Sequence, residues 1–361
     1  MSLETLRVAT IHIGERSYPV FVGGGLLGQL GEAIRGHLPG ITGCVAVTSS
    51  PVDLLYGGRM MTALTALHPE KVLVPEGEEA KNWNAVGELL GTLIKRGLDR
   101  RGVVVALGGG SVGDSVGFAA SIYMRGVRIV QVPTTLLGQV DSGIGGKTAV
   151  NHIAGKNLIG SFHQPSLVLC DTDLLASLPR RELLSGLAEV AKYGVVADSI
   201  LFKVLEDKAE RLLSAEADTL RWVVTRCVAA KAKYVEADER DDKGVRASLN
   251  YGHTLGHAIE TLSGYEIRHG EAVAIGMVAA SRVAVSLGLL RQRDLNRQIE
   301  LLDALGLPTE SPYGADEVLP SMRRDKKAEN GLLRLVLPTG IGADPVVRSV
   351  SETEIREALG S

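Results

Sequence analysis

The first half of the chain alternates short apolar runs with stretches of helical spacing. The runs are rich in β-branched residues and read CVAVTS (44–49), KVLVPEG (71–77), GVVVALGGG (102–110), VRIVQVP (127–133) and SLVLCD (166–171). Between them, a segment such as NWNAVGELLGTLIKRG (82–97) has the periodicity of an amphipathic helix. This alternation predicts a mostly parallel sheet with helices on its faces. Ligands of such sheets bind beyond the carboxyl ends of the strands.

The second half of the chain has a different pattern. From about Pro179 onward Ala, Leu and Glu dominate, and the apolar positions have helical spacing in RRELLSGLAEVAKYGVV (180–196), DTLRWVVTRCVAAKAKYVEADER (218–240), EAVAIGMVAASRVAVSLGLL (271–290) and DLNRQIELLDALGL (294–307). Near the end, LLRLVLPTGIG (332–342) predicts a small hairpin or edge strand. We therefore expect an α/β domain over residues 1–178, a helical domain over 179–361, and an active site in the cleft between them.

Composition narrows the functional classes. The 361 residues are 45% hydrophobic and 22% charged with a net charge of −3, which is typical of a soluble globular protein. The basic residues form no long patch, which argues against nucleic acid or an anionic membrane as partner. No apolar run has bilayer-spanning length, and MSLETLRVAT lacks the features of a signal peptide. Cys44, Cys170 and Cys227 are too few and too far apart for a disulfide framework, so we expect a cytoplasmic protein.

A glycine motif follows one predicted strand. Gly108, Gly110 and Gly113 spell G-x-G-x-x-G in VVVALGGGSVGD. Glycine lets a backbone approach a phosphate, and a helix N-terminus supplies N–H donors. However, the acidic residue that a Rossmann motif places after the next strand is missing, because that strand ends in VQVPTT. The turn could hold a pyrophosphate, or it could be an ordinary glycine-rich turn between a strand and a helix.

A second glycine-rich stretch, QVDSGIGGKTAVNHIAGKNLIG (139–160), contains Asp141, Lys147, Lys156 and Asn157. Lysine beside closely approachable glycine backbone suits an anionic substrate. The stretch is not a Walker A motif, because Asp occupies the position of its first glycine. The alternative interpretation is a flexible surface loop.

Three histidines and a glutamate could form a metal site. Glu189 lies three residues before Lys192, on one face of a predicted helix, and His253 and His257 are four residues apart. His269 follows shortly afterwards. Catalytic zinc commonly takes three ligands from His, Asp and Glu, so Glu189 with two of these histidines would suffice. The spacing is not H-E-x-x-H, which excludes that protease class, and any single histidine could instead be a core or helix-end residue.

Several stretches together resemble the 3-dehydroquinate synthase family. They occur in the family's order and read GGGSVGD, QVPTTLLGQVDSGIGGKTAVN, GKNLIG, GLAEVAKYG, ADER, LNYGHTLGHAIE and HGEAVAIGM. The resemblance extends from about PEGEEAK to RDKK, which is most of the chain. It implies an N-terminal nucleotide-binding α/β domain, a helical C-terminal domain, NAD, a divalent metal that is usually zinc but can be cobalt, and a homodimer.

The resemblance also implies roles for individual residues. The metal would be held by Glu189, His253 and His269, which leaves His257 to face the substrate phosphate. NAD would be bound by Glu76, Gly77, Glu78, Lys81, Gly110, Ser111, Val112, Gly113, Asp114, Thr134, Thr135, Asp141, Lys147, Lys156, Leu174, Leu175, Ala176 and Ser177. The substrate would be bound by Arg125 of the neighbouring subunit and by Asp141, Lys147, Asn157, Lys192, Lys231, Arg246, Asn250, His257 and one of Lys326 and Lys327. Among these, Asp141, Lys147, Lys192, Asn250 and His257 would take part in catalysis.

The implied substrate is 3-deoxy-D-arabino-heptulosonate 7-phosphate, a phosphorylated sugar acid. Its conversion to 3-dehydroquinate combines transient oxidation, phosphate elimination, reduction, ring opening and an intramolecular aldol closure. Two enzymatic alternatives remain: another sugar-phosphate cyclase, or a metal- and NAD-dependent polyol dehydrogenase. A dehydrogenase would need no clamp for phosphate and carboxylate, so the many cations argue against it. A binding protein without catalysis would not need a metal trio and a cofactor loop together.

Overall fold

The computed structural model describes residues 3–325 and 332–359. By its internal contacts the chain divides into two units. The first comprises Met1–Leu178 and Leu220–Arg240, and the second comprises Pro179–Thr219 and Asp241–Ser361. The chain thus changes unit at the predicted boundary, but the segment Leu220–Arg240 returns to the first unit. The helical pattern of that segment indicated its secondary structure and not the unit on which it packs.

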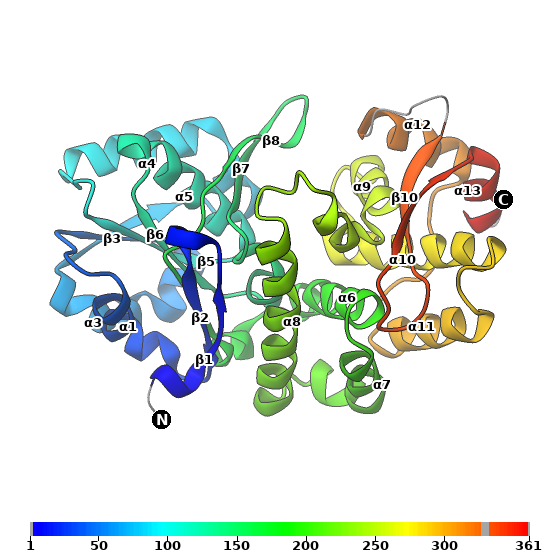
Figure 1. The fold of residues 1–361 in the computed structure, drawn as a ribbon. Helices are drawn as coiled ribbons and strands as arrows, with labels where there is room; N and C mark the ends of the chain where they lie inside the picture. The colour runs from blue at the N-terminus through cyan, green and yellow to red at the C-terminus, as the bar shows by residue number, and fades with distance from the viewer. Residues whose placement is uncertain (1–2, 326–331, 360–361) are drawn as a thin grey trace. The chain divides into compact units, whose positions relative to one another are not determined.

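The first unit is built on a parallel sheet. Within its described residues, seven strands form one sheet in the order β1-β2-β9-β6-β5-β3-β4 (Figure 1). β1 and β2 are antiparallel, and the other neighbouring strands are parallel. The strands are β1 (Arg7–Ile11), β2 (Tyr18–Gly23), β3 (Cys44–Ser49), β4 (Pro69–Val74), β5 (Val103–Gly108), β6 (Arg128–Pro133) and β9 (Leu167–Asp171). The five predicted apolar runs account for β3, β4, β5, β6 and β9, which confirms the predicted α/β class.

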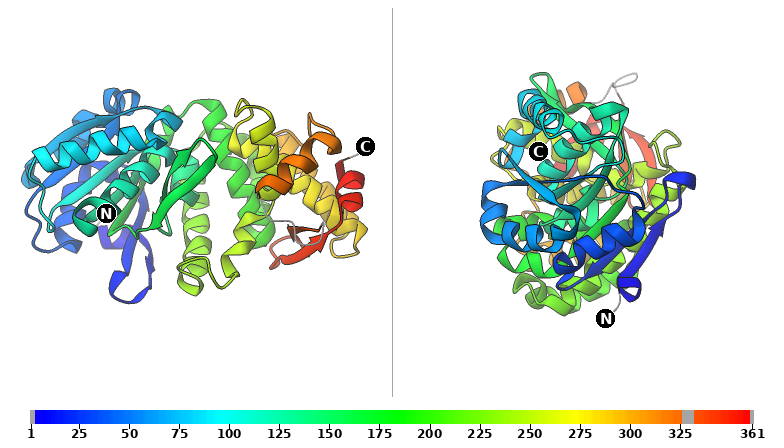
Figure 2. Two further views of the ribbon diagram at one scale, coloured as in Figure 1. Left: turned by 90° about the horizontal axis from the view of Figure 1, so that it is seen from above. Right: turned by 90° about the vertical axis from the view of Figure 1, so that its left-hand side faces the viewer.

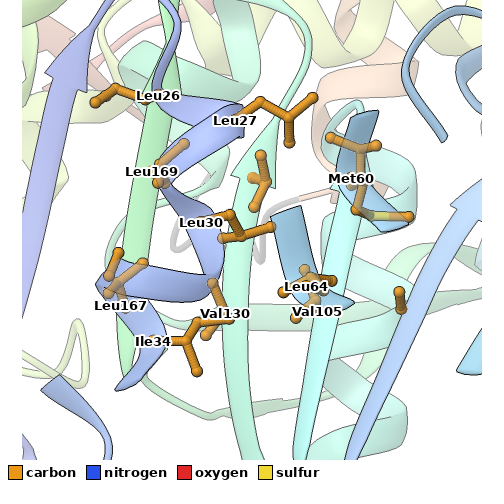
Figure 3. Close-up of a cluster of buried hydrophobic side chains, with 14 of the residues drawn as sticks. Leu26, Leu27, Leu30, Ile34, Met60, Leu64, Val105, Val130, Leu167 and Leu169 are labelled. Atoms are coloured by element: carbon orange, nitrogen blue, oxygen red, sulfur yellow. The ribbon is translucent and has the colours of Figure 1, made fainter. Parts of the chain in front are cut away.

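Helices cover both faces of this sheet (Figure 1 and Figure 2). The helices of the first unit are α1 (Leu30–His37), α2 (Ser50–Val52), α3 (Gly58–Leu64), α4 (Trp83–Lys95), α5 (Gly110–Ile122) and most of α8 (Ala217–Ala237). Val105 of β5 packs with α1 and α3 in the cluster of Figure 3, whereas its neighbours Val104 and Ala106 pack with α4 and α5. Strand side chains alternate between faces, so a strand that is apolar at every position needs a helical layer on each side.

The second glycine-rich stretch forms a hairpin. β7 (Lys147–His152) pairs with β8 (Gly155–Phe162) in an antiparallel ribbon within the first unit. Val150 anchors the ribbon in the core beneath α4 and α5, and the hydroxyl groups of Thr148 and Ser161 lie 2.9 Å apart across it. The stretch therefore forms paired strands from Lys147 onward, after the short helical turn η8 (Gly138–Ser142).

The second unit is mainly helical, as predicted. Its helices are α6 (Arg180–Val196), α7 (Ser199–Leu213), α9 (His253–Leu262), α10 (His269–Ser286), α11 (Gln292–Ala304), α12 (Ala315–Asp325) and α13 (Glu352–Leu359). β10 (Leu333–Leu337), inside the predicted LLRLVLPTGIG segment, pairs with the later β11 (Val346–Val350), and Figure 2 shows this ribbon beside α13. Among the described residues, no helix is both long and apolar enough to cross a membrane.

Helices α9 and α10 meet by direct backbone contact. A Cβ atom added to Gly276 of α10 would lie 2.0 Å from the carbonyl oxygen of Gly252. A Cβ at Gly256 of α9 would lie 3.1 Å from the carbonyl oxygen of Ala272. Gly252 itself has a left-handed φ of 80°, which side chains disfavour. The glycines therefore set the distance between the two helices, whose first residues are His253 and His269.

This contact yields a stability prediction. Gly276→Ala should lower the free energy of unfolding by about 2–3 kcal/mol, because the added methyl group meets backbone that cannot rotate away. Gly340→Ala, in the same unit, is the matched control, since its Cβ would meet only the Ala343 methyl at 3.7 Å. The control should stay within about 0.5 kcal/mol of the parent in a urea titration. Equal stability of the two variants would contradict the proposed backbone contact.

Candidate active site

Three helices of the second unit bring a glutamate and two histidines to one point. Glu189 lies in the middle of α6 and is fully buried, while His253 and His269 begin α9 and α10. The Glu189 Oε1 atom is 3.5 Å from His253 Nε2 and 3.4 Å from His269 Nε2. One ligand atom of each residue lies within 4.8 Å of the others. The residues named by the resemblance thus form a trio that could hold a metal ion.

Hydrogen bonds at the far side of each ring define which nitrogen faces this point. His253 Nδ1 lies 3.1 Å from the carbonyl oxygen of Tyr251, and His269 Nδ1 lies 3.0 Å from Glu260 Oε2. A carbonyl oxygen and an ionised carboxylate can only accept, so each Nδ1 carries the proton. In the neutral ring the lone pair is then on Nε2, directed toward Glu189. This is the tautomer that a metal at the trio requires.

The two histidines differ in charge. Burial lowers the pKa of His253 to about 3, although Glu189 acts in the opposite direction. Burial also acts to lower the pKa of His269, but hydrogen bonds to Glu189 and Glu260 outweigh it and raise this pKa to about 10. At neutral pH His253 is therefore neutral and His269 is a cation held between two carboxylates.

Lys192 and His257 stand beside the trio. Lys192, almost fully buried one turn along α6, forms an ion pair with Glu189. The His257 ring centroid is 5.5 Å from that of His253 and 6.0 Å from that of His269. Arg246 and Asn250 lie on the short helix η10 (Val245–Asn250), which precedes α9 and packs against α6. Of the predicted residues of this unit, Lys326 and Lys327 lie outside the described residues.

In the first unit, the glycine motif forms the turn from β5 to α5. A Cβ at Gly108 would lie 2.7 Å from Val112 Cβ, and one at Gly110 would lie 2.8 Å from Ser142 Oγ. Gly109 at the N-cap provides no side chain to accept the first N–H groups of α5. The first N–H groups of α5 are therefore not capped by a side chain of Gly109, an arrangement that both an ordinary turn and a pyrophosphate site allow.

The loop after β6 lies beside this turn. The Thr134 N–H donates to the Gly108 carbonyl oxygen at 2.9 Å, and Thr135 Oγ1 accepts from the Gly138 N–H at 3.0 Å. Both loops leave the carboxyl ends of adjacent parallel strands, where ligands of such sheets bind. The structure thus places the predicted threonines next to the predicted glycines.

A hydrogen-bond network joins three segments near α5. Lys81 of η6 (Gly77–Lys81) is buried and donates to Asp114 Oδ2 and Asn157 Oδ1, both at 2.6 Å. Burial raises the pKa of Asp114, against the lowering effect of Lys81. Glu78 accepts from Ser111 at 3.4 Å and from Asn151 at 2.6 Å. The predicted residues of this group therefore bind one another, and Asn151 joins them without having been predicted.

The remaining predicted residues of the first unit are spread over several segments. Lys231 of α8 is buried and binds both the carboxylate and the carbonyl oxygen of Asp141. Glu76 is the N-cap of η6 and Gly77 has a φ of 57°. Gly113 and Val112 lie in α5, Lys147 begins β7, Lys156 lies in β8, and Leu174, Leu175, Ala176 and Ser177 lie in η9 (Thr172–Ser177). Tyr56 ties η9 down through the Leu174 carbonyl and the Ser177 hydroxyl.

Comparison with known proteins decides the family. The model of the 3-dehydroquinate synthase N-terminal domain matches residues 71–185, and that of the C-terminal domain matches residues 186–328. The 3-dehydroquinate synthase of Pelobacter propionicus is 47% identical over 352 residues, covering 96% of this chain and 97% of that protein. The chain belongs to the 3-dehydroquinate synthase family.

Solved cyclases share the fold of this 3-dehydroquinate synthase family member. A 2-deoxy-scyllo-inosose synthase, crystallised with carbaglucose-6-phosphate, NAD+ and Co2+, is 28% identical with a TM-score of 0.89, and the match covers 97% of this chain and 98% of that chain. A 2-epi-5-epi-valiolone synthase from Streptomyces hygroscopicus, with NAD+ and Zn2+ bound, is 33% identical with a TM-score of 0.86, covering 96% and 97%. Both contain a nucleotide and a divalent metal.

One residue next to the trio escaped the sequence reasoning. Glu260 lies seven positions after His253 on α9, a spacing that returns to the same helix face. That spacing was visible in LNYGHTLGHAIE but carried no signal by itself, because the partner, His269, comes from the next helix. Asn151 was missed for a similar reason, since its partner Glu78 is distant in sequence.

The charge difference between the histidines predicts proton release. At about pH 7, a divalent metal binding to the trio should release about one proton, because His269 must become neutral whereas His253 already is. The affinity should therefore rise about tenfold per pH unit until His269 deprotonates. Calorimetric titration with Zn2+ in buffers of different ionisation enthalpy measures this number. Heat that does not depend on the buffer would contradict the prediction.

Proposed function

We propose that the chain is a 3-dehydroquinate synthase that converts 3-deoxy-D-arabino-heptulosonate 7-phosphate to 3-dehydroquinate and phosphate. The observation that carries this proposal is the 47% identity to a curated synthase over almost the whole chain. Identity to the two solved cyclases of other names is lower, at 28% and 33%. The proposed reaction is a step of aromatic biosynthesis in the shikimate pathway, as the family resemblance implies.

We infer that one divalent metal ion per subunit binds Glu189, His253 and His269. Two imidazoles and one carboxylate are a common ligand set of catalytic zinc, and zinc is our first choice, with cobalt the alternative. The Nδ1 hydrogen bonds to Tyr251 and Glu260 fit this assignment, because they leave both Nε2 atoms facing Glu189. When bound, the metal would supply Lewis-acid stabilisation to the oxygen of the substrate alcohol that is oxidised to a ketone. The role of the trio is to hold the metal ion and to fix its position. Lys192 balances the negative charge of Glu189.

We infer that NAD binds at the β5–α5 turn and its neighbouring loops. The N–H groups at the start of α5 suit a pyrophosphate, and the close glycine contacts leave no room for side chains there. The chemistry that a bound NAD would supply is reversible hydride transfer, without net consumption of the nucleotide. The Lys81–Asp114–Asn157 network holds the β7–β8 hairpin against α5, and the proposed cofactor residues Lys147 and Lys156 lie on this hairpin.

The cations of the chain suit a substrate with a phosphate and a carboxylate. Lys192 and Lys231 are buried, and each is paired with a carboxylate, that of Glu189 and Asp141 respectively. A buried ammonium held in this way is positioned before substrate binds, which lowers the cost of ordering it. We propose that a phosphate oxygen of the substrate accepts the proton during elimination, and that Lys147 and His257 lie next to this oxygen. We further propose that Arg246, Asn250 and Asn157 bind the substrate.

We also propose a cytoplasmic homodimer in which Arg125 of one subunit reaches the phosphate in its partner. Arg125 is exposed in the turn after α5, and both Met124 and Arg125 have left-handed φ angles, of 49° and 65°. Such angles are strained for these residue types and often mark functional positions. Burial raises the pKa of the Cys44 thiol to about 12, so this thiol is a poor nucleophile.

The assay that tests the function mixes purified chain, Zn2+, a catalytic amount of NAD and the heptulosonate phosphate. We expect phosphate and 3-dehydroquinate in equal amounts and no net NADH, because the hydride returns within one turnover. A reaction without added NAD, after removal of bound nucleotide, is the control. Accumulating NADH would indicate a polyol dehydrogenase. Turnover of heptulose 7-phosphate in place of the heptulosonate would indicate another sugar-phosphate cyclase.

The metal assignment predicts different effects of the two histidines on α9. His253→Ala should weaken Zn2+ binding by more than about 100-fold. Removing the hydrogen-bond partner of a metal ligand typically costs about 10- to 100-fold in affinity, and removing the ligand itself costs more. His257→Ala should leave Zn2+ affinity within about threefold while lowering turnover. Competition with a chromogenic chelator measures both affinities. Equal loss of metal in the two variants would overturn the division of roles.

A further inference from the structure

We propose that Glu260 is the positioning residue that aims His269 at the metal position of the Glu189–His253–His269 trio. The inference deepens the proposed function and rests on it. Glu260 is not one of the three proposed ligands. It binds the Nδ1 atom of His269, and so determines the direction in which the Nε2 atom of the same ring points.

The geometry places the imidazole of His269 between two carboxylates. Its Nδ1 atom is 3.0 Å from Glu260 Oε2, and its Nε2 atom is 3.4 Å from Glu189 Oε1. Glu260 has a side-chain exposure of only 7%, so little solvent competes for this contact. A ring held at both nitrogens keeps one orientation and one tautomer. A carboxylate at Nδ1 also makes Nε2 a stronger electron donor to a metal.

His269 depends on a side chain where His253 does not. His253 is oriented by the carbonyl of Tyr251, a buried residue whose hydroxyl lies 3.0 Å from the Met277 carbonyl and 2.6 Å from Ser281 Oγ. His269 follows a turn in which Gly264 and Tyr265 have left-handed φ angles, and it is the first residue of its helix. The Glu260 carboxylate is the partner of its Nδ1 atom, so this side chain has for His269 the role that the Tyr251 carbonyl has for His253.

Glu260 is itself held in place at its main chain. Its carbonyl oxygen accepts from the Tyr265 N–H at 2.9 Å and from Ser263 Oγ at 2.9 Å. Ser263 Oγ in turn accepts from the Ile267 N–H at 3.2 Å. These bonds fix the turn between α9 and α10, and therefore the distance from the Glu260 carboxylate to His269. Residues His253 and Glu260, two turns apart on α9, thereby serve the same site.

A second interpretation makes Glu260 a metal ligand. Glu260, His257 and His269 also offer ligand atoms within 4.8 Å of one another. The Nδ1 atom of His269, the nitrogen nearer to Glu260, already donates to that carboxylate in the structure. The hydrogen bond therefore favours the positioning role, and the metal stoichiometry separates the two interpretations.

The test compares Glu260→Ala and Glu260→Gln with the parent chain, all as full-length protein loaded with Co2+. We expect Glu260→Ala to weaken Co2+ binding about 10- to 100-fold in a chelator competition, and to change the visible absorption of the bound ion. Glu260→Gln should lose less, because its amide oxygen can still accept from Nδ1. Proton NMR of the Co2+ form should lose the shifted, exchangeable Nδ1–H signal of His269 in Glu260→Ala and retain that of His253.

Glu271→Gln is the matched control. It removes the same charge two residues from His269, but its carboxylate binds Arg181 and the Arg268 N–H. We expect its Co2+ affinity and absorption to match those of the parent. If Glu260→Ala does not fold, as judged by circular dichroism, Glu260→Gln carries the test through its absorption spectrum.

Three results would overturn the proposal. They are unchanged affinity and spectrum in both Glu260 variants, an effect no larger than that of Glu271→Gln, and two Co2+ ions in the parent against one in Glu260→Ala. Failure of the proposed function is distinguishable, because a chain that binds Co2+ with these properties but does not turn over the heptulosonate phosphate would contradict the function alone.

Discussion

The second unit is organised around one buried carboxylate. Glu189 is fully buried in the middle of α6, and an ionised group at such a position costs several kcal/mol unless positive partners surround it. Lys192 on the same helix and the cationic His269 at the start of α10 supply two such partners, and the neutral His253 approaches from the start of α9. The close glycine contact between α9 and α10 allows both histidines to reach it.

In the first unit, close packing at glycine residues determines the geometry of the β5–α5 turn. The turn from β5 to α5 brings glycine Cα atoms so close to Val112 and Ser142 that side chains are excluded. The buried ammonium of Lys81 links this helix to the β7–β8 hairpin through Asp114 and Asn157.

Local patterns predicted the elements well because their causes are local. The β-branched runs form strands, and the Ala- and Leu-rich periodic segments form helices. A continuous apolar run indicates a strand buried on both faces, and apolar residues at helical spacing indicate a helix buried along one stripe. The packing of Leu220–Arg240 on the first unit was not predictable in this way. Its helical pattern indicates that one face of the helix is buried, but it does not indicate which part of the protein covers that face. The pair of Lys231 and Asp141, ninety residues apart, shows which partner was chosen.

The sequence by itself determined the fold class, the glycine turn and, through the family resemblance, the set of residues expected at the site. Spacing alone left His253 and His257 equivalent, because four residues place both on one helix face, and only the family resemblance assigned His253 to the metal. The tertiary structure supplies a physical basis for that assignment, because Glu189 lies against His253 and His269 and the Nδ1 atoms of both rings have hydrogen-bond partners. Glu260 gained a role only in three dimensions. The reason is that a ligand site is defined by directions of lone pairs from several helices, and one helix's periodicity contains no information about the others.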